Sequence, residues 1–325
     1  MAPAEERGKL NSVFDVSINL GILLGYVTGF VIHMVSPDNW RLMLGCGAIL
    51  PIIVLALLAA LPETPHYSVM ANQSQQALHD LQRLGHDKDE AEETIRDMQK
   101  EIRKDRQKST KYCSPGLQLS VGFGFFQQIA GSEAILYYTA DFLDKAGLTS
   151  PVMRLLGNCM VGLCKLLPEL VTMKCVDTVG RRPIMLWSAF ALFVFLSALS
   201  LAFYIGASAT WIIALLCCSV GSFSIGLGPF TFLCVSENLS ATERSMGVTY
   251  CAATNRFTSG LVALTVVSLY NVIGLGNLFA AYALLRLLSM VFYWYTPETA
   301  GMSLEEIQAA KASENSEIDN DRLEP

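Results

Sequence analysis

Long apolar runs alternate with short polar links along most of the chain. A helix needs about 20 apolar residues to cross a bilayer core about 30 Å thick, and eight runs approach or exceed this length. They cover residues 10–34, 42–61, 117–140, 152–175, 184–206, 210–235, 247–272 and 276–296. The pattern predicts an all-α multi-pass membrane protein with about eight transmembrane helices.

Basic residues in the links predict the orientation of these spans. Most Lys and Arg of the links lie in 62–116, 176–183 and 236–246, which fall on one side of the bilayer. The opposite links carry only Arg41 and Lys145. Because cytoplasmic links are enriched in Lys and Arg, we expect both termini in the cytoplasm. The rule gives sidedness and leaves the identity of the membrane open.

Hydropathy divides the chain into four parts. Residues 1–61 hold two spans, 62–116 form a charged linker, 117–296 hold six spans, and 297–325 form a polar cytoplasmic tail. Apolar residues recur at helical spacing between Ser74 and Lys108, which predicts two or three short amphipathic helices rather than a solvated, featureless linker. The acidic tail is expected to be mostly disordered.

Composition narrows the function classes. Of 325 residues, 52% are hydrophobic and 16% are charged, and the formal net charge is −6. A soluble domain carries about 25% charged residues, and nucleic-acid binding would call for a basic stripe. The four His show no metal-ligand spacing, and phosphate-loop, HExxH and nucleophile-elbow motifs are missing. We therefore expect no enzyme, no metal and no cofactor.

Polar residues within the apolar runs are the candidate functional groups, because each is costly in lipid and needs a partner or a water-filled cavity. They are Asp15, Gln127, Gln128, Glu133, Lys165, Glu169, Asn255, Arg256 and Arg286. A single polar residue of this kind more often bonds two helices together. The cluster from Gln127 to Glu133 favours a cavity, since Gly131 permits a helix break there. Amide side chains both donate and accept, which suits hydroxyl-rich solutes.

Five motifs, in order along the chain, resemble those of the sugar porter family of the major facilitator superfamily. They are Pro62-Glu63-Thr64-Pro65, Gln127-Gln128-Ile129-Ala130-Gly131 with Tyr137-Tyr138, Asp177-Thr178-Val179-Gly180-Arg181-Arg182, Gly228-Pro229 with Ser236-Glu237 and Arg244, and Pro297-Glu298-Thr299-Ala300-Gly301. The resemblance implies a partial major facilitator fold. It also implies alternating-access transport of a hexose, pentose or polyol, by uniport or by proton symport.

The resemblance also implies two sets of site residues. The expected substrate-binding residues are Asp15, Gln127, Gln128, Glu133, Tyr137, Lys165, Phe232 and Asn255. The expected cytoplasmic gate consists of Arg7, Asp177, Gly180, Arg181, Arg182, Glu237 and Arg244. The expected partners are a sugar or polyol, protons in the symport case, and the lipid bilayer.

The chain departs from the family in length. Family members have twelve spans in two halves of six, and the first span here matches the fifth of the family, so 1–61 resembles a remnant of the N-terminal half. We expect an incomplete gene model or fragment that lacks the first four transmembrane helices. The alternative is a truncated isoform that does not transport and acts as a sensor or as a partner of full-length carriers.

Charged residues stand where the family carries amides or an indole. Glu133, Lys165 and Arg256 are examples, and the Lys165 segment resembles the D-xylose–proton symporter-like branch. Glu133 and Lys165 form an ion pair in one interpretation, because an unpaired buried charge is costly. In a second, Glu133 or Asp15 carries a proton. A further alternative, suggested by the same charged residues, is that the protein carries a charged, non-sugar solute.

Overall fold

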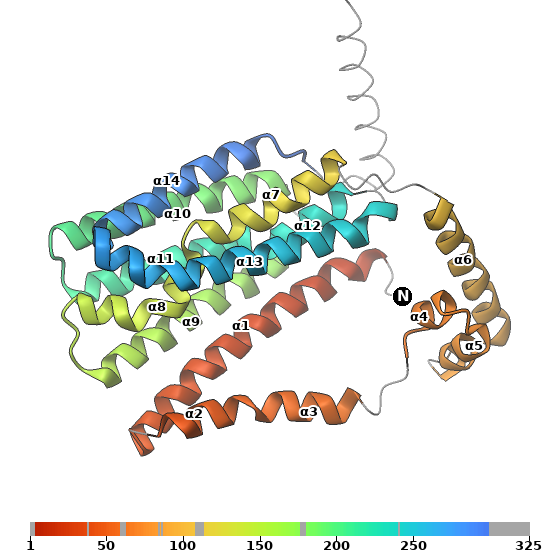
Figure 1. Ribbon diagram of the computed structural model, residues 1–325, viewed down its shortest axis with the longest axis horizontal. Coiled ribbons are helices and arrows are strands. Elements are labelled where there is room, and N and C mark those ends of the chain that lie inside the picture. The colour runs from red at the N-terminus through yellow and green to blue at the C-terminus, as the bar shows by residue number, and fades with distance from the viewer. Residues whose placement is uncertain are drawn as a thin grey trace, which may run out of the picture. The chain divides into compact units, whose positions relative to one another are not determined.

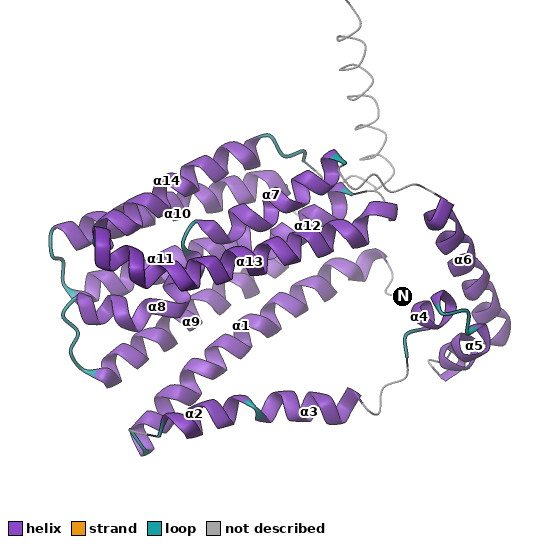
Figure 2. Cartoon of the chain, in the orientation of Figure 1, coloured by secondary structure: helices purple, strands orange, loops and turns teal. Residues whose placement is uncertain are grey.

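The computed structural model describes residues 4–37, 39–58, 63–83, 85, 87–107, 114–175, 180–239 and 241–298. Every regular element among them is a helix (Figure 2), which confirms the all-α expectation. Seven stretches are long and apolar enough to cross a membrane: Asp15–Val35, Trp40–Leu58, Pro151–Thr172, Arg181–Tyr204, Ala209–Asn238, Glu243–Ile273 and Leu275–Trp294. The span expected at 117–140 is not among them, because two shorter helices divide it.

The chain forms two compact units, one of Met1–Trp40 with Cys113–Pro325 and the other of Arg41–Tyr112. The helices of the first unit are α1 (Ala4–Val35), α7 (Pro115–Ile129), α8 (Ser132–Lys145), α9 (Pro151–Cys175), α10 (Arg181–Tyr204), α11 (Ala209–Ile225), α12 (Leu227–Asn238), α13 (Ala241–Ile273) and α14 (Leu275–Trp294).

Helices α7 to α14 form a bundle with α1 packed along α9 (Figure 1). Within it α10 packs against α11 and α14, α7 packs against α13, and α11 packs against α9. Fully buried aromatic side chains, such as Phe123, Phe142, Phe230 and Phe279, fill the centre. Phe203 stacks on Phe279 with 5.5 Å between the ring centroids.

The break between α7 and α8 follows from local chemistry. Helix α7 begins after Ser114, whose Oγ accepts the backbone N–H of Leu117 at 3.3 Å. It ends at Ile129, and Gly131 then takes a φ of +86°, which L side chains rarely adopt. A Cβ on Gly131 would also lie 2.6 Å from the ring of Tyr282. Glycine is therefore required at this break, which the sequence had suggested.

A second break separates α11 from α12 at Gly226. A Cβ there would lie 2.7 Å from Cβ of Ser188 and 2.8 Å from the backbone oxygen of Ile184. The Ser188 hydroxyl donates to the backbone oxygen of Ser222 at 2.6 Å and accepts the backbone N–H of Leu227 at 3.3 Å. It thereby satisfies backbone groups that the break leaves free.

The second unit holds α2 from Arg41 onward (the helix spans Trp40–Gly47), α3 (Ile49–Leu58), α4 (Pro65–Met70), α5 (Ser74–Arg83) and α6 (Lys88–Gln107). The side chains of α3 are exposed apolar groups throughout. In contrast, α4, α5 and α6 enclose a small core of Val69, Ala77, Leu81, Ala91, Ile95 and Met98. Helices α5 and α6 lie in the segment from Ser74 to Lys108 where amphipathic helices were expected, and α4 precedes it. The acidic tail from 299 lies outside the described residues.

Candidate functional site

Three amides meet where α7 ends beside the middle of α13. The amide Nε2 of Gln127 donates to the backbone oxygens of Leu227 and Gly228, at 2.9 and 3.1 Å. Asn255 donates from Nδ2 to Oε1 of Gln127, and Gln128 donates from Nε2 to Oδ1 of Asn255 at 3.2 Å. All three side chains are buried. We call Gln127, Gln128 and Asn255 the amide triad.

The triad depends on a close approach of two helices. Gly124 lies one turn before Gln127 on α7, and Cys251 lies one turn before Asn255 on α13. A Cβ on Gly124 would collide with the backbone oxygen of Cys251 and would lie 3.2 Å from the backbone nitrogen of Asn255. Because Gly124 has no side chain, α7 and α13 pack closely enough for Gln127 and Gln128 to form hydrogen bonds with Asn255.

Beyond the break, α8 carries Glu133 and two tyrosines. Glu133 is buried in the first turn of α8. The hydroxyls of Tyr137 and Ser259 lie 3.3 Å apart, and Tyr138 donates to the backbone oxygen of Ala263 at 2.6 Å. Tyr137 remains more than half exposed. Phe232 of α12 is instead half-buried against the bundle core.

The ion pair considered between Glu133 and Lys165 is not formed as a direct contact. Lys165 is 7% exposed, and among the described side chains no carboxylate oxygen lies within 4.0 Å of its Nζ. Its Nζ lies 5.8 Å from the ring centroid of Phe223. Four charged groups still lie within electrostatic range of Lys165: Glu133, Glu169, Arg256 and Asp15. Arg256 is exposed and Asp15 half-buried.

A contact that sequence reasoning did not identify joins α1 to α9. Asn19 donates from Nδ2 to Oε2 of Glu169, and both side chains are buried. Pro168 precedes Glu169 inside α9 and contributes no N–H to the helix. Tyr26, two turns after Asn19, donates to the backbone oxygen of Leu136 at 2.6 Å. These two contacts join α1 to α9, the helix that carries Lys165, and to α8.

The expected gate residues gather where α10 begins and where α12 and α14 end. The carboxylate of Glu298 accepts the backbone N–H groups of Arg181 and Arg182, at 2.9 and 3.0 Å. Gly180 precedes them, and a Cβ there would lie 2.7 Å from Oε2 of Glu298. Arg182 donates from Nη2 to the backbone oxygen of Trp294 and lies 5.1 Å from its ring centroid. The role of Glu298 was missed, although its motif had been noticed.

Two further contacts complete this end of the bundle. Arg181 and Glu237 form an ion pair with 3.5 Å between Nη2 and Oε1. Arg244 donates from Nε to the backbone oxygen of Ser236 at 2.8 Å. Five of the expected gate residues thus lie at this end of the bundle: Gly180, Arg181, Arg182, Glu237 and Arg244. Asp177 lies outside the described residues, and Arg7 lies on α1 with a side chain that is not described.

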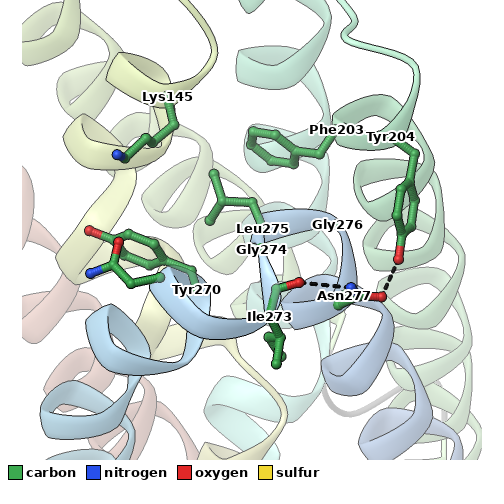
Figure 3. A pocket seen from close by; sticks show the side chains of 10 residues that line it. Lys145, Phe203, Tyr204, Tyr270, Ile273, Gly274, Leu275, Gly276 and Asn277 are labelled. Atoms are coloured by element: carbon green, nitrogen blue, oxygen red, sulfur yellow. Dashed lines mark hydrogen bonds between the residues drawn. The ribbon is translucent and has the colours of Figure 1, made fainter.

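A separate pocket of about 460 Å³ opens where α10 ends and α13 meets α14. Figure 3 shows Tyr204 directed at Asn277, whose Nδ2 donates to the backbone oxygen of Ile273 at 2.7 Å. Lys145 of α8 and Tyr270 of α13 line the other side. The pocket includes none of the residues expected to bind substrate.

The chemistry available at the site is noncovalent. Amides, hydroxyls and ring faces are groups that can bind polar solutes, and the carboxyl groups near Lys165 are titratable. Within the part of the chain that the structure describes, no group of three or more His, Cys, Asp or Glu is placed to hold a metal ion.

Comparison with known proteins places this geometry in a family. The family model described as "Sugar (and other) transporter" matches residues 1–310. The chain belongs to this sugar transporter family. Two relatives are Probable polyol transporter 4 of Arabidopsis thaliana and Probable metabolite transport protein CsbC of Bacillus subtilis. The first is 34% identical over 95% of this chain and 62% of its own length. The second is 27% identical over 95% of this chain and 68% of its own length.

Solved structures of the major facilitator superfamily share the fold. The proton:xylose symporter XylE bound to 6-bromo-6-deoxy-D-glucose matches with a TM-score of 0.75 and 25% identity, over 95% of this chain and 68% of that chain. The inward open conformation of XylE from E. coli has the same TM-score, with 24% identity, 95% coverage of this chain and 66% of that chain. These relatives are named as transporters and not as enzymes. The chain spans about two thirds of their length.

Proposed function

We propose that this chain serves the transmembrane transport of a sugar or polyol by alternating access. The proposal rests mainly on the amide triad. Oε1 of Gln128 is buried and accepts no hydrogen bond from the described residues, which is costly for an amide oxygen in a dry site. A hydroxyl group of a solute would supply the missing donor. A second buried oxygen without a partner, Oγ of Ser132, lies just beyond the break.

The surroundings of the triad favour a hydroxyl-rich solute. Gln127 is fixed by two backbone oxygens of α12, so its amide is held in one orientation. Tyr137 adds an exposed aromatic side chain and a hydroxyl that bonds to Ser259. Fixed amides and one exposed ring are a usual combination for binding a small polar ligand in a largely apolar wall. Membership of a sugar transporter family supports the same solute class.

We place the end of the bundle with Arg181, Arg182 and Arg244 on the cytoplasmic side, as the positive-inside rule predicts. In this arrangement the contacts of Glu298 with α10 and the ion pair of Arg181 with Glu237 hold the cytoplasmic ends of α10, α12 and α14 together. Opening to the cytoplasm requires these contacts to separate. Cysteine labelling of whole cells at Ser245 and at Asn271, which lie near opposite ends of α13, tests this sidedness.

Solute counterflow in proteoliposomes tests the function. The purified chain is reconstituted with excess unlabelled polyol or sugar inside, and entry of labelled solute is measured. We expect entry, and an apparent affinity about tenfold weaker in Gln128→Ala, since one hydrogen bond contributes up to about 1.5 kcal/mol. Asn271→Ala is the matched control, because this exposed amide lies at the far end of α13.

Three results would change the proposal. Equal affinities in Gln128→Ala and Asn271→Ala would remove the triad from the binding site. Competition by hydroxy acids, with none by sugars or polyols, would replace the neutral solute by an anionic one bound near Lys165 and Arg256. Exchange that occurs only after co-reconstitution with a full-length relative would support the alternative of a partner of full-length carriers.

A further inference from the structure

Two pairs of polar residues face each other across the contact of α1 with α9. Asp15 and Asn19 lie one turn apart on α1, and Lys165 and Glu169 lie one turn apart on α9. Asn19 donates to Glu169, and these side chains are 6% and 4% exposed. The two helices thus share a buried hydrogen bond between an amide and a carboxyl group.

The amide of this contact is only half satisfied. Nδ2 of Asn19 donates to Oε2 of Glu169, but Oδ1 of Asn19 is buried and has no hydrogen-bond donor among the described residues. A buried acceptor without a donor is costly. Carboxylates only accept hydrogen bonds, whereas a protonated carboxyl group also donates one. A proton on Glu169 would therefore let the acid and the amide satisfy each other in both directions.

The charges around this contact also favour a bound proton. Three carboxyl groups, Asp15, Glu133 and Glu169, lie within electrostatic range of one buried ammonium group, Lys165. Arg256 is the cation that also lies in range, and its side chain is exposed. Titratable groups nearby also include Tyr26, Tyr137, Cys159, Cys164 and Cys217. An excess of buried negative charge is unfavourable, so the cluster favours at least one protonated carboxyl group.

Geometry separates a proton from a metal ion as the bound species. The three carboxyl groups belong to three helices, and they form no cluster able to hold a metal ion among the described residues. Lys165 also makes no direct ion pair with Glu169, so its charge does not replace the proton. Asp15, which lies within electrostatic range of both Lys165 and Glu169, is half-buried and thus more exposed than Glu169.

We propose that Glu169, paired with Asn19 across α1 and α9, is a proton-binding site. Resting on the proposed transport function, this site couples a proton to solute movement. The proton comes from water and returns to water, and no other bond is made or broken. When Glu169 loses the proton, Oδ1 of Asn19 loses its donor and the cluster gains one negative charge. Both effects weaken the contact of α1 with α9, so protonation and the separation of these helices are linked.

Infrared spectroscopy tests the site without any transport measurement. The chain in lipid vesicles is titrated with pH, and the C=O stretching band of protonated carboxyl groups is recorded. We expect a band near neutral pH whose area falls by one carboxyl group in Glu169→Gln. Asp144→Asn is the control, since Asp144 lies in a partly exposed ion pair with Arg154. A band of unchanged area in Glu169→Gln overturns the proposal.

A second variant keeps the test available if Glu169→Gln does not fold. Asn19→Ala leaves the carboxyl group in place and removes its partner. We expect the C=O band to move to higher frequency, because the carboxyl group loses hydrogen bonds. A band that neither moves nor changes its pH dependence in Asn19→Ala overturns the pairing.

Proton movement tests the coupling. Vesicles containing a pH-sensitive dye receive an inward solute gradient, and we expect acidification of the lumen by the wild-type chain. In Glu169→Gln we expect acidification at least tenfold slower, with counterflow retained. Acidification that persists at the wild-type rate contradicts the role of Glu169. If the wild-type chain shows no counterflow, the transport function fails, while the infrared titration still decides whether Glu169 binds a proton.

Discussion

Gly124 of α7 and Cys251 of α13 lie so close that no side chain fits between them. The backbone oxygen of Cys251 occupies the place that a Cβ on Gly124 would take. One turn further along the two helices, Gln127 and Asn255 form their hydrogen bond. The spacing of the backbones at the glycine thus sets the spacing of the amides.

Replacement of Gly124 by alanine should push α7 and α13 apart. The new methyl group meets backbone rather than a movable side chain, so we expect a loss of about 1–3 kcal/mol in stability. A lower thermal unfolding midpoint in detergent is the readout. Gly260→Ala on α13 is the control, because its Cβ would meet open space. There the greater helix propensity of alanine should give a gain of up to about 1 kcal/mol. Equal midpoints for both variants would contradict the close approach.

Removal of the carboxylate of Glu298 should loosen the first turn of α10. Glu298→Ala deletes two charge-assisted hydrogen bonds to backbone N–H groups at a helix N-terminus, and we expect a cost of about 2–3 kcal/mol. Hydrogen exchange followed by mass spectrometry should show faster exchange at Arg181 and Arg182. Glu298→Gln retains an acceptor and should lie between wild type and alanine.

The control for Glu298 is Asp144→Ala. Asp144 also pairs with an arginine, at 2.7 Å from Arg154, but its side chain is half exposed. Exposed pairs contribute about 0–1 kcal/mol. Protection of Arg181 and Arg182 that stays at the wild-type level in Glu298→Ala would show that the carboxylate does not cap α10.

Loss of one hydroxyl should weaken the contact of α1 with α8. Tyr26→Phe removes the half-buried bond to the backbone oxygen of Leu136 and leaves that oxygen without this donor. We expect a cost of about 1–2 kcal/mol in thermal stability. Tyr137→Phe is matched to it, because it removes a hydroxyl that is more exposed and bonds to Ser259 at 3.3 Å. A greater loss in Tyr137→Phe than in Tyr26→Phe would contradict the burial of the α1 contact.

The small core of α4, α5 and α6 contains one ill-placed carboxyl group. Asp80 is buried, its Oδ2 has no partner among the described residues, and Nδ1 of His79 lies 3.8 Å from Oδ1. Asp80→Leu should therefore slow hydrogen exchange across α5 by about fivefold or more, since an unsatisfied buried oxygen costs 1 kcal/mol or more. The exposed Asp97, changed to leucine, serves as the control and should leave exchange in α5 unchanged. Faster exchange in Asp80→Leu would show that the carboxyl group has a stabilising partner.

Features that depend on local sequence were predictable. The apolar runs gave the helices, because hydropathy and span length are properties of consecutive residues. The break at Gly131 was anticipated from a glycine between polar residues, and the structure shows why no other residue fits. The amides Gln127, Gln128 and Asn255 were chosen as candidates, and the structure brings them into contact.

Features that depend on distant partners were not predictable. Asn19 and Glu169 are 150 residues apart, and neither has a local motif that indicates the other. Glu169 looks like any polar residue in a helix until Asn19 is placed opposite it. The expected direct ion pair of Glu133 with Lys165 is not formed, for a related reason. The sequence shows two opposite charges on neighbouring helices. It does not show the direction of the Lys165 side chain, which lies over the ring of Phe223. Side-chain direction across a helix contact is a property of the packed bundle.

The cap on α10 has a consequence for the order of events during synthesis. The backbone N–H of Arg181 bonds to a carboxylate 117 residues later in the chain. When α10 leaves the ribosome, the N–H groups of its first turn therefore lack the carboxylate of Glu298 as an acceptor. This acceptor becomes available only after α11 to α14 have been synthesised. The bundle receives this contact only after α14 is complete. A chain interrupted between α14 and Glu298 would contain all seven spans found among the described residues and still lack the bond that joins the first turn of α10 to the end of α14.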